Sequence, residues 1–152
     1  MRGVQQANRR PVLLFARHGE AEHNVALEGR EFAPHEVLEL FTTSLEDPPL
    51  TSRGVRQAQG LAATLASLPD ELRPTIVVAS TQTRALQTAL IATASSALGG
   101  GGDVCVIGLE ELRERHGRWL CERRRNKAAL LVDPRLSSKR LDLRGVTEAD
   151  SL

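Results

Sequence analysis

The chain has 152 residues, which suits one domain with its own core, and hydrophobic residues make up 41% of it. A formal net charge of +1 gives no global field that would favour nucleic acid or an anionic membrane. No apolar run approaches the ~20 residues of a membrane-spanning helix. Two cysteines are too few for a disulfide framework and lack metal-site spacing, so we expect a cytoplasmic protein with no metal.

Residues 1–11 contain three arginines, no acidic residue and no apolar segment, so we do not expect a secretory signal. We expect a disordered tail over 1–10 and a single domain over 11–152. The apolar run over 11–16 predicts a first buried strand, and a short helix follows within 20–28. Prolines then interrupt the chain, with one or two helical turns over 35–41.

Helices and strands alternate through the middle of the chain. The expected elements are a helix capped by Thr51 or Ser52, a strand over 75–79, a helix over 83–98 and a strand over 104–107. Four glycines, at 99–102, follow the second of these helices and are expected to terminate it. No clear period follows over 133–152. The alternation predicts an α/β fold, with a mostly parallel sheet and helices on both faces.

The tetrapeptide Arg17-His18-Gly19-Glu20 follows the first predicted strand, at the carboxyl end where open α/β sheets bind ligands. A neutral imidazole can attack phosphorus, and a planar guanidinium is shaped to bind phosphate oxygens. Taken alone, the tetrapeptide is equally compatible with a strand that ends in polar residues. The motifs further along the chain decide between these interpretations.

Five motifs stand in the order of a known family's pattern. They are Arg17-His18-Gly19-Glu20, Asn24, Pro49-Leu50-Thr51 with Gly54 and Gln57-Ala58, Ser80 with Arg84-Ala85-Leu86-Gln87-Thr88-Ala89, and Leu112-Arg113-Glu114. Over about residues 11 to 125 the chain resembles the histidine phosphatase superfamily. The resemblance implies the phosphoglycerate-mutase-like fold and a reaction through a phosphohistidine.

The resemblance also implies the catalytic residues. His18 would be the nucleophile, with its imidazole neutral and one nitrogen free. Glu114 would be the general acid that protonates the leaving oxygen, and Glu110 and Glu111 are competing choices.

Phosphate binding is implied for Arg17 and Arg84, which would hold the same phosphoryl group. Asn24 would contact phosphate or brace its loop. Glu20 is expected to be structural, near a helix start. The resemblance implies no cofactor and no metal, because arginines supply the positive charge.

The segment after residue 112 resembles two branches of the family. Glu114-Arg115-His116-Gly117 matches a mutase segment only with a gap and without its tyrosine, whereas Leu112-Arg113-Glu114, Gly117 and Cys121-Glu122-Arg123-Arg124 match a phosphatase branch without gaps. We therefore favour a phosphatase acting on a small phosphorylated metabolite, with phosphoglycerate mutase as an alternative. The basic run over 123–127 is interpreted as a solvated helix face rather than an anion or nucleic-acid site.

One expected feature of the family is missing. The resemblance implies a second histidine, on a later strand, that donates a hydrogen bond to the phosphoryl group. The histidines stand at 18, 23, 35 and 116, and none follows. We therefore expect a C-terminally truncated domain that lacks the last strands and leaves sheet edges open. The alternative function is a catalytically dead, phosphate-binding remnant.

Overall fold

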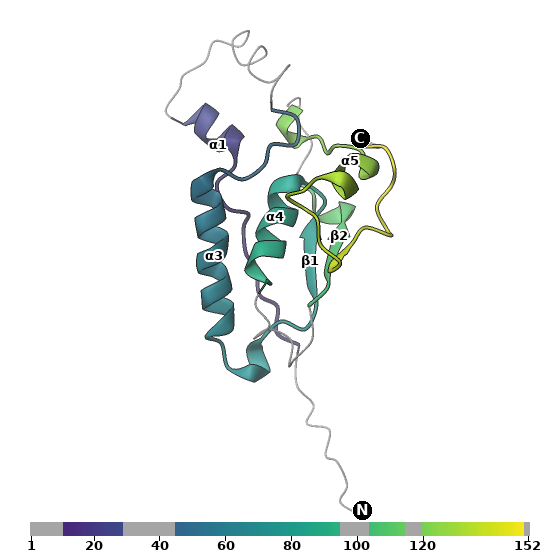
Figure 1. Ribbon diagram of the computed structural model, residues 1–152. Helices are drawn as coiled ribbons and strands as arrows, with labels where there is room; N and C mark the ends of the chain where they lie inside the picture. The colour runs from purple at the N-terminus through teal and green to yellow at the C-terminus, as the bar shows by residue number, and fades with distance from the viewer. Residues whose placement is uncertain (1–10, 29–44, 95–103, 115–119, 151–152) are drawn as a thin grey trace, which may run out of the picture.

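A parallel three-stranded sheet forms the centre of the protein. The computed structural model describes residues 11–28, 45–94, 104–114 and 120–150 (Figure 1). Its strands are β1 (Val77–Ser80), β2 (Val106–Leu109) and β3 (Leu141–Asp142), in the order β1-β2-β3. Val77 pairs with Val106, which pairs in turn with Leu141. The predicted α/β class and parallel sheet are confirmed.

Four α-helices and three single 3-10 turns accompany the sheet in the described residues. They are α1 (Glu22–Leu27), α3 (Ser52–Ala66), α4 (Thr83–Ala92), α5 (Lys127–Val132), η1 (Asp70–Leu72), η2 (Glu110–Leu112) and η3 (Leu120–Glu122). As predicted, Thr51 caps α3, because its Oγ1 accepts a hydrogen bond from the amide of Gly54 at 3.0 Å. Within the described ranges, every helix is too short or too polar to cross a membrane.

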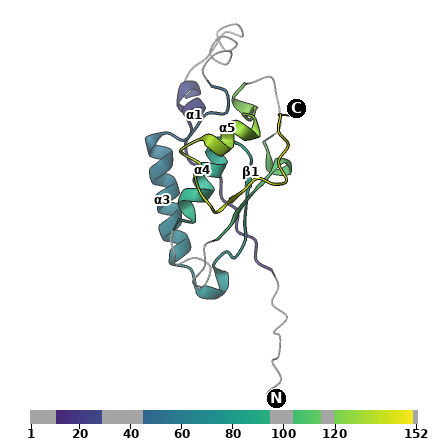
Figure 2. The same ribbon diagram turned by 45° about the vertical axis from the view of Figure 1, so that its right-hand side comes forward.

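The hydrophobic core lies on one face of the sheet. Helix α4 packs on this face, and α3 lies beside α4 (Figures 1 and 2). The buried residues of this core are Ala79, Leu86, Leu90, Val106, Leu130, Leu136, Leu143 and Val146. Val78, whose side chain alternates with those of Val77 and Ala79, is 49% exposed.

The prediction of a buried strand over 11–16 is wrong. This segment runs towards α1 as irregular backbone, without a ladder to β1, and Phe15 is 91% exposed (Figure 1). An apolar run indicates a tendency to be buried, but a strand also needs a hydrogen-bonded neighbour and cover for its side chains. In the described residues the segment has neither.

Other element boundaries differ in smaller ways. Helix α4 ends at Ala92 instead of residue 98, and β2 begins two residues later than predicted. Helix α5 and strand β3 were not predicted, because six and two residues are too few to show a period. The predictions for 1–10, 35–41, 99–102 and His116 concern positions outside the described residues.

Candidate active site

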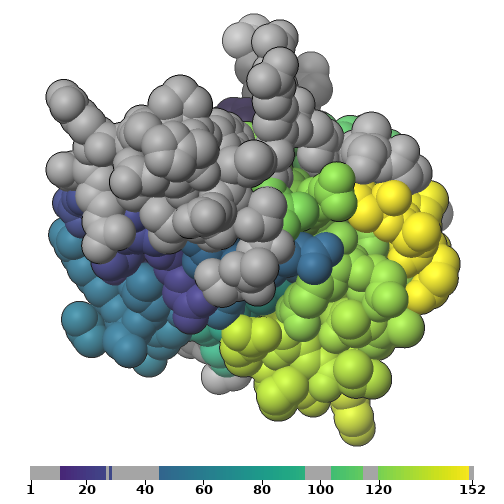
Figure 3. Space-filling view, turned by 90° about the horizontal axis from the view of Figure 1, so that it is seen from above, coloured from purple at the N-terminus to yellow at the C-terminus, as the bar shows by residue number. Residues whose placement is uncertain are grey.

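The predicted site residues come from three separate parts of the chain. His18 precedes α1, Arg84 lies in the first turn of α4 directly after β1, and Glu114 follows η2 directly after β2. Because β1 and β2 are parallel, their carboxyl ends meet at one edge of the sheet. Figure 3 views the molecule from above, and purple and blue atoms of the N-terminal third lie there beside green atoms of later segments.

Arg84 joins the other members of the site. Its side chain is only 1% exposed. Its Nε donates to Nε2 of His18 at 3.3 Å, and its Nη1 donates to the carbonyl oxygen of Cys121 at 2.9 Å. Its Nη2 contacts Oε2 of Glu114 at 3.3 Å. The structure therefore brings two other predicted residues, His18 and Glu114, into contact with the buried guanidinium of Arg84.

The hydrogen bonds of His18 determine which of its nitrogens carries the proton. Nδ1 lies 2.7 Å from the carbonyl oxygen of Gly19, which can only accept, so Nδ1 carries the proton. Nε2 keeps its lone pair and accepts from Arg84. Burial, followed by the charges of Arg84 and Arg17, lowers the pKa of His18 below 6.5, against an opposing hydrogen bond to Gly19. The imidazole is therefore neutral near pH 7, and Nε2 is its unprotonated nitrogen.

The backbone next to His18 is fixed from two sides. The amide of Gly19 donates to Oγ1 of Thr88 at 3.1 Å, and that hydroxyl donates to the carbonyl of Arg84 at 2.8 Å. Glu20 binds Oγ1 of Thr51 at 2.6 Å and Nη1 of Arg53 at 3.1 Å. Glu20 thus makes contacts of the structural kind that the sequence indicated.

The two other predicted binding residues are placed differently. Arg17 is exposed, yet close enough for its charge to lower the pKa of His18. Asn24 turns to the start of α1, where its Oδ1 accepts from the amide of Ala21 at 2.9 Å and its Nδ2 donates to Nε2 of His23 at 3.1 Å. Of the two roles predicted for Asn24, these contacts are those of a brace.

The geometry also separates Glu114 from its competitors. Glu110 accepts from Oγ1 of Thr81 at 2.9 Å and pairs with Nη2 of Arg124 at 2.8 Å. Both oxygens of its carboxylate therefore already have structural partners. Glu111 is exposed. Glu114 combines contact with Arg84 and a side chain that is 58% exposed. It is therefore the acid that both touches the site and can be reached by a substrate.

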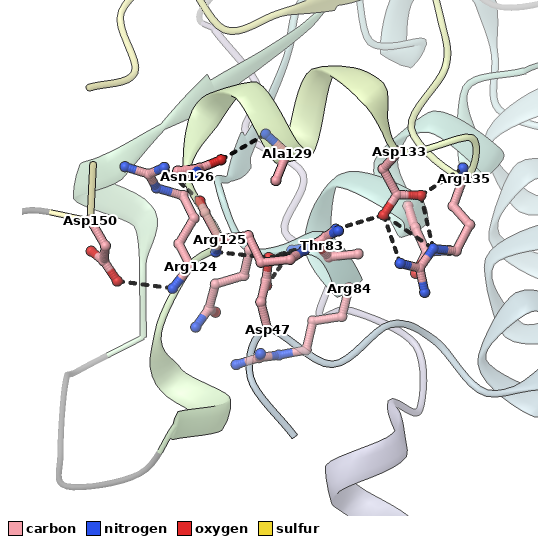
Figure 4. Close-up of polar contacts among 12 residues, drawn as sticks. Asp47, Thr83, Arg84, Arg124, Arg125, Asn126, Ala129, Asp133, Arg135 and Asp150 are labelled. Carbon is pink, nitrogen blue, oxygen red and sulfur yellow. Dashed lines mark hydrogen bonds and ion pairs between the residues drawn. The ribbon is translucent and has the colours of Figure 1, made fainter. Parts of the chain in front are cut away.

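Sequence reasoning missed the role of Asp47. This buried residue has a φ of 46°, and its carboxylate accepts from the amide of Thr83 at 2.8 Å and from its Oγ1 at 2.7 Å (Figure 4). Arg125 contacts the same carboxylate at 3.4 Å. Because Thr83 begins α4 and precedes Arg84, Asp47 positions the helix end that carries the guanidinium. The left-handed conformation, which Asp and Asn tolerate best after glycine, was not foreseeable from composition.

The interpretation of residues 123–127 as a solvated helix face is wrong for two of the arginines. Arg124 is buried, and its Nη2 donates to the carbonyl of Ala149 at 3.0 Å while pairing with Glu110. Arg125 pairs with Asp133 at 2.6 Å as well as with Asp47 (Figure 4). Both lie between η3 and α5, where carboxylates and carbonyls from distant segments surround them.

Comparison with known proteins identifies the family. A family model described as the histidine phosphatase superfamily (branch 1) matches residues 13–131, so the chain belongs to this superfamily and the predicted resemblance is confirmed. Neither the curated proteins nor the solved structures gave a match. The described residues contain no group of three or more His, Cys, Asp or Glu side chains arranged to hold a metal ion.

Proposed function

We propose that the protein is a phosphatase that hydrolyses a small phosphorylated metabolite through a phosphohistidine on His18. One observation carries this proposal: a neutral imidazole and a carboxylate from different segments contact the same buried guanidinium, that of Arg84. A nucleophile, a cation and a proton donor are the groups that phosphoryl transfer requires.

In the first step, Nε2 of His18 attacks the phosphorus atom, and the bond between phosphorus and the leaving oxygen breaks. Arg84, with Arg17 at the exposed side, balances the charge on the phosphoryl oxygens. Glu114, as a carboxylate displaced from Arg84, takes the proton of the substrate's phosphate monoanion and passes it to the leaving alkoxide, which departs as an alcohol. Substrate displaces Glu114 from Arg84, and the exposure of the carboxyl group makes this movement possible.

In the second step, water attacks the phosphohistidine, and the bond between phosphorus and Nε2 breaks. Glu114, now a carboxylate, accepts the proton of the water. Inorganic phosphate leaves with the proton that Glu114 took from the water, Glu114 returns to a carboxylate, and His18 returns to its neutral tautomer with the proton on Nδ1. We expect neither metal nor cofactor, because arginine side chains supply the positive charge.

Turnover of p-nitrophenyl phosphate tests the proposal. The wild type should hydrolyse it and form an acid-labile, base-stable phosphoenzyme, and His18→Ala should abolish both. Cys105→Ser, at an exposed position, serves as the control and should leave both unchanged. Turnover by His18→Ala would exclude the mechanism. Phosphate binding without turnover would favour the binding remnant, and transfer between the two phosphoglycerate positions would favour the mutase.

A further inference from the structure

A second imidazole lies next to the nucleophile. His23, on α1, is only 8% exposed, and its ring centroid lies 6.1 Å from that of His18, with the ring planes tilted by 53°. The charges of Arg84, Arg17 and Glu114 all act on it. His23 therefore lies among the site residues, although the family motifs in the sequence gave it no role.

The neighbouring amide determines the tautomer of His23. The backbone amide of Ala21 can only donate, so the atom of Asn24 that it contacts at 2.9 Å is the oxygen, Oδ1. The other amide atom of Asn24, Nδ2, then donates to Nε2 of His23 at 3.1 Å. Nε2 is an acceptor, and the proton of the neutral ring is on Nδ1.

This Nδ1–H group is a buried donor without a partner among the described residues. An unpaired buried donor is unfavourable, and in a native structure it indicates strain or a functional role. Burial and the positive charge of Arg84 lower the pKa of His23 to about 4. The ring thus offers a neutral, oriented donor and does not compete for the proton of the leaving group.

We propose that His23 is a substrate-binding residue whose Nδ1–H donates a hydrogen bond to an oxygen of the phosphoryl group bound at His18. The proposed reaction holds phosphoryl oxygens, which are hydrogen-bond acceptors, at Nε2 of His18, and the ring centroid of His18 lies 6.1 Å from that of His23. The inference rests on the proposed function for its substrate class. The assignment of Nδ1 as the hydrogen-bond donor of His23 follows from the contacts of Asn24 and does not depend on the proposed function.

Two variants separate the donor from the ring. His23→Phe keeps an aromatic ring and removes the donor, so it should weaken orthovanadate binding and lower kcat roughly 100-fold, the effect of removing one preorganised donor. His23→Asn places an amide N–H near the position of Nδ1 and should retain activity within about tenfold. Val25→Ala, at an exposed position of the same helix, should leave binding and turnover unchanged.

The wild type provides a measurement that does not depend on folding of a variant or on turnover. Nitrogen-15 NMR should show the proton of His23 on Nδ1, and orthovanadate should shift that signal together with those of His18. A His23 signal that vanadate leaves unchanged would overturn the inference, whatever the turnover. If vanadate shifts the signal but aryl phosphate is not hydrolysed, the proposed function fails and the His23 inference stands. Normal turnover by His23→Phe would overturn only the inference.

Discussion

The backbones of Gly19 and Gly54 are in direct contact. A Cβ atom placed on Gly19 would lie 2.5 Å from the carbonyl oxygen of Gly54, and a Cβ on Gly54 would collide with the carbonyl of Glu20. The amide of Thr51 donates to that carbonyl at 2.9 Å. The backbone that follows His18 is thereby held against the first turn of α3, and only glycine fits at either side of the contact.

Gly54→Ala should therefore destabilise the protein by about 1–3 kcal/mol, because the added methyl group meets backbone that cannot move aside cheaply. The displaced segment carries His18, so activity should fall as well. Gly60→Ala is the matched control on α3, since nothing lies within 4 Å of its Cβ position. It should stabilise the protein by about 0.5–1 kcal/mol. Urea denaturation of both variants measures the effect, and equal free energies of unfolding would contradict it.

Asp47→Asn should destabilise the protein by about 2 kcal/mol, because it removes the charge of the buried carboxylate that accepts from Thr83, while Arg125 keeps its other partner, Asp133. Asparagine tolerates the left-handed backbone, so the variant tests the loss of charge and not strain. Loosening of Thr83 should also reduce turnover, because Arg84 follows it on α4.

The control for this variant is Asp142→Asn, which removes a pair with Arg144, whose side chain is 92% exposed. Exposed pairs contribute little, so its free energy of unfolding should change by less than about 1 kcal/mol. Chemical denaturation distinguishes the two variants. If Asp47→Asn were as mild as the control, the role of Asp47 in holding α4 would be wrong.

Local signals made much of the fold predictable from sequence. The Thr51 hydroxyl and the apolar spacing after it predicted α3, and Ser80 marks the end of β1 as expected. The proximity of Arg84 and Glu114 was also predictable, because each follows a strand and parallel strands end at one edge.

Features that depend on distant partners were not predictable. The burial of Arg124 depends on Glu110 and on carbonyls near residue 149, which no local pattern connects to it. The segment 11–16 shows the opposite error, since its composition predicts a strand but the described residues offer it no ladder. His23 could have been noticed as a polar residue in the first turn of α1, but its place beside His18 depends on the fold.

Glu114→Gln should reveal the general acid through its dependence on the leaving group. Glutamine can still contact Arg84 but cannot supply a proton, so hydrolysis of alkyl phosphates should slow by about 10²–10⁴. p-Nitrophenyl phosphate, whose leaving group needs no protonation, should be affected far less. Glu111→Gln, at an exposed position on η2, is the control and should behave as wild type with both substrates. If Glu114→Gln slowed hydrolysis of both substrates equally, Glu114 would not be the general acid.

The stability of the protein should fall between pH 7 and pH 5 because of His23. Burial, and then the charge of Arg84, lowers its pKa to about 4, whereas an unfolded imidazole titrates near 6.5. Below pH 6.5 the unfolded chain therefore binds more protons than the folded one, and the free energy of unfolding decreases as the pH falls towards 4. From pH 7 to pH 5, His23 alone should remove about 2 kcal/mol. His18, whose pKa is also lowered, acts in the same direction. Urea denaturation at both pH values should show a pH dependence about 2 kcal/mol smaller in His23→Phe, and an unchanged dependence would mean that His23 is not held neutral in the folded protein.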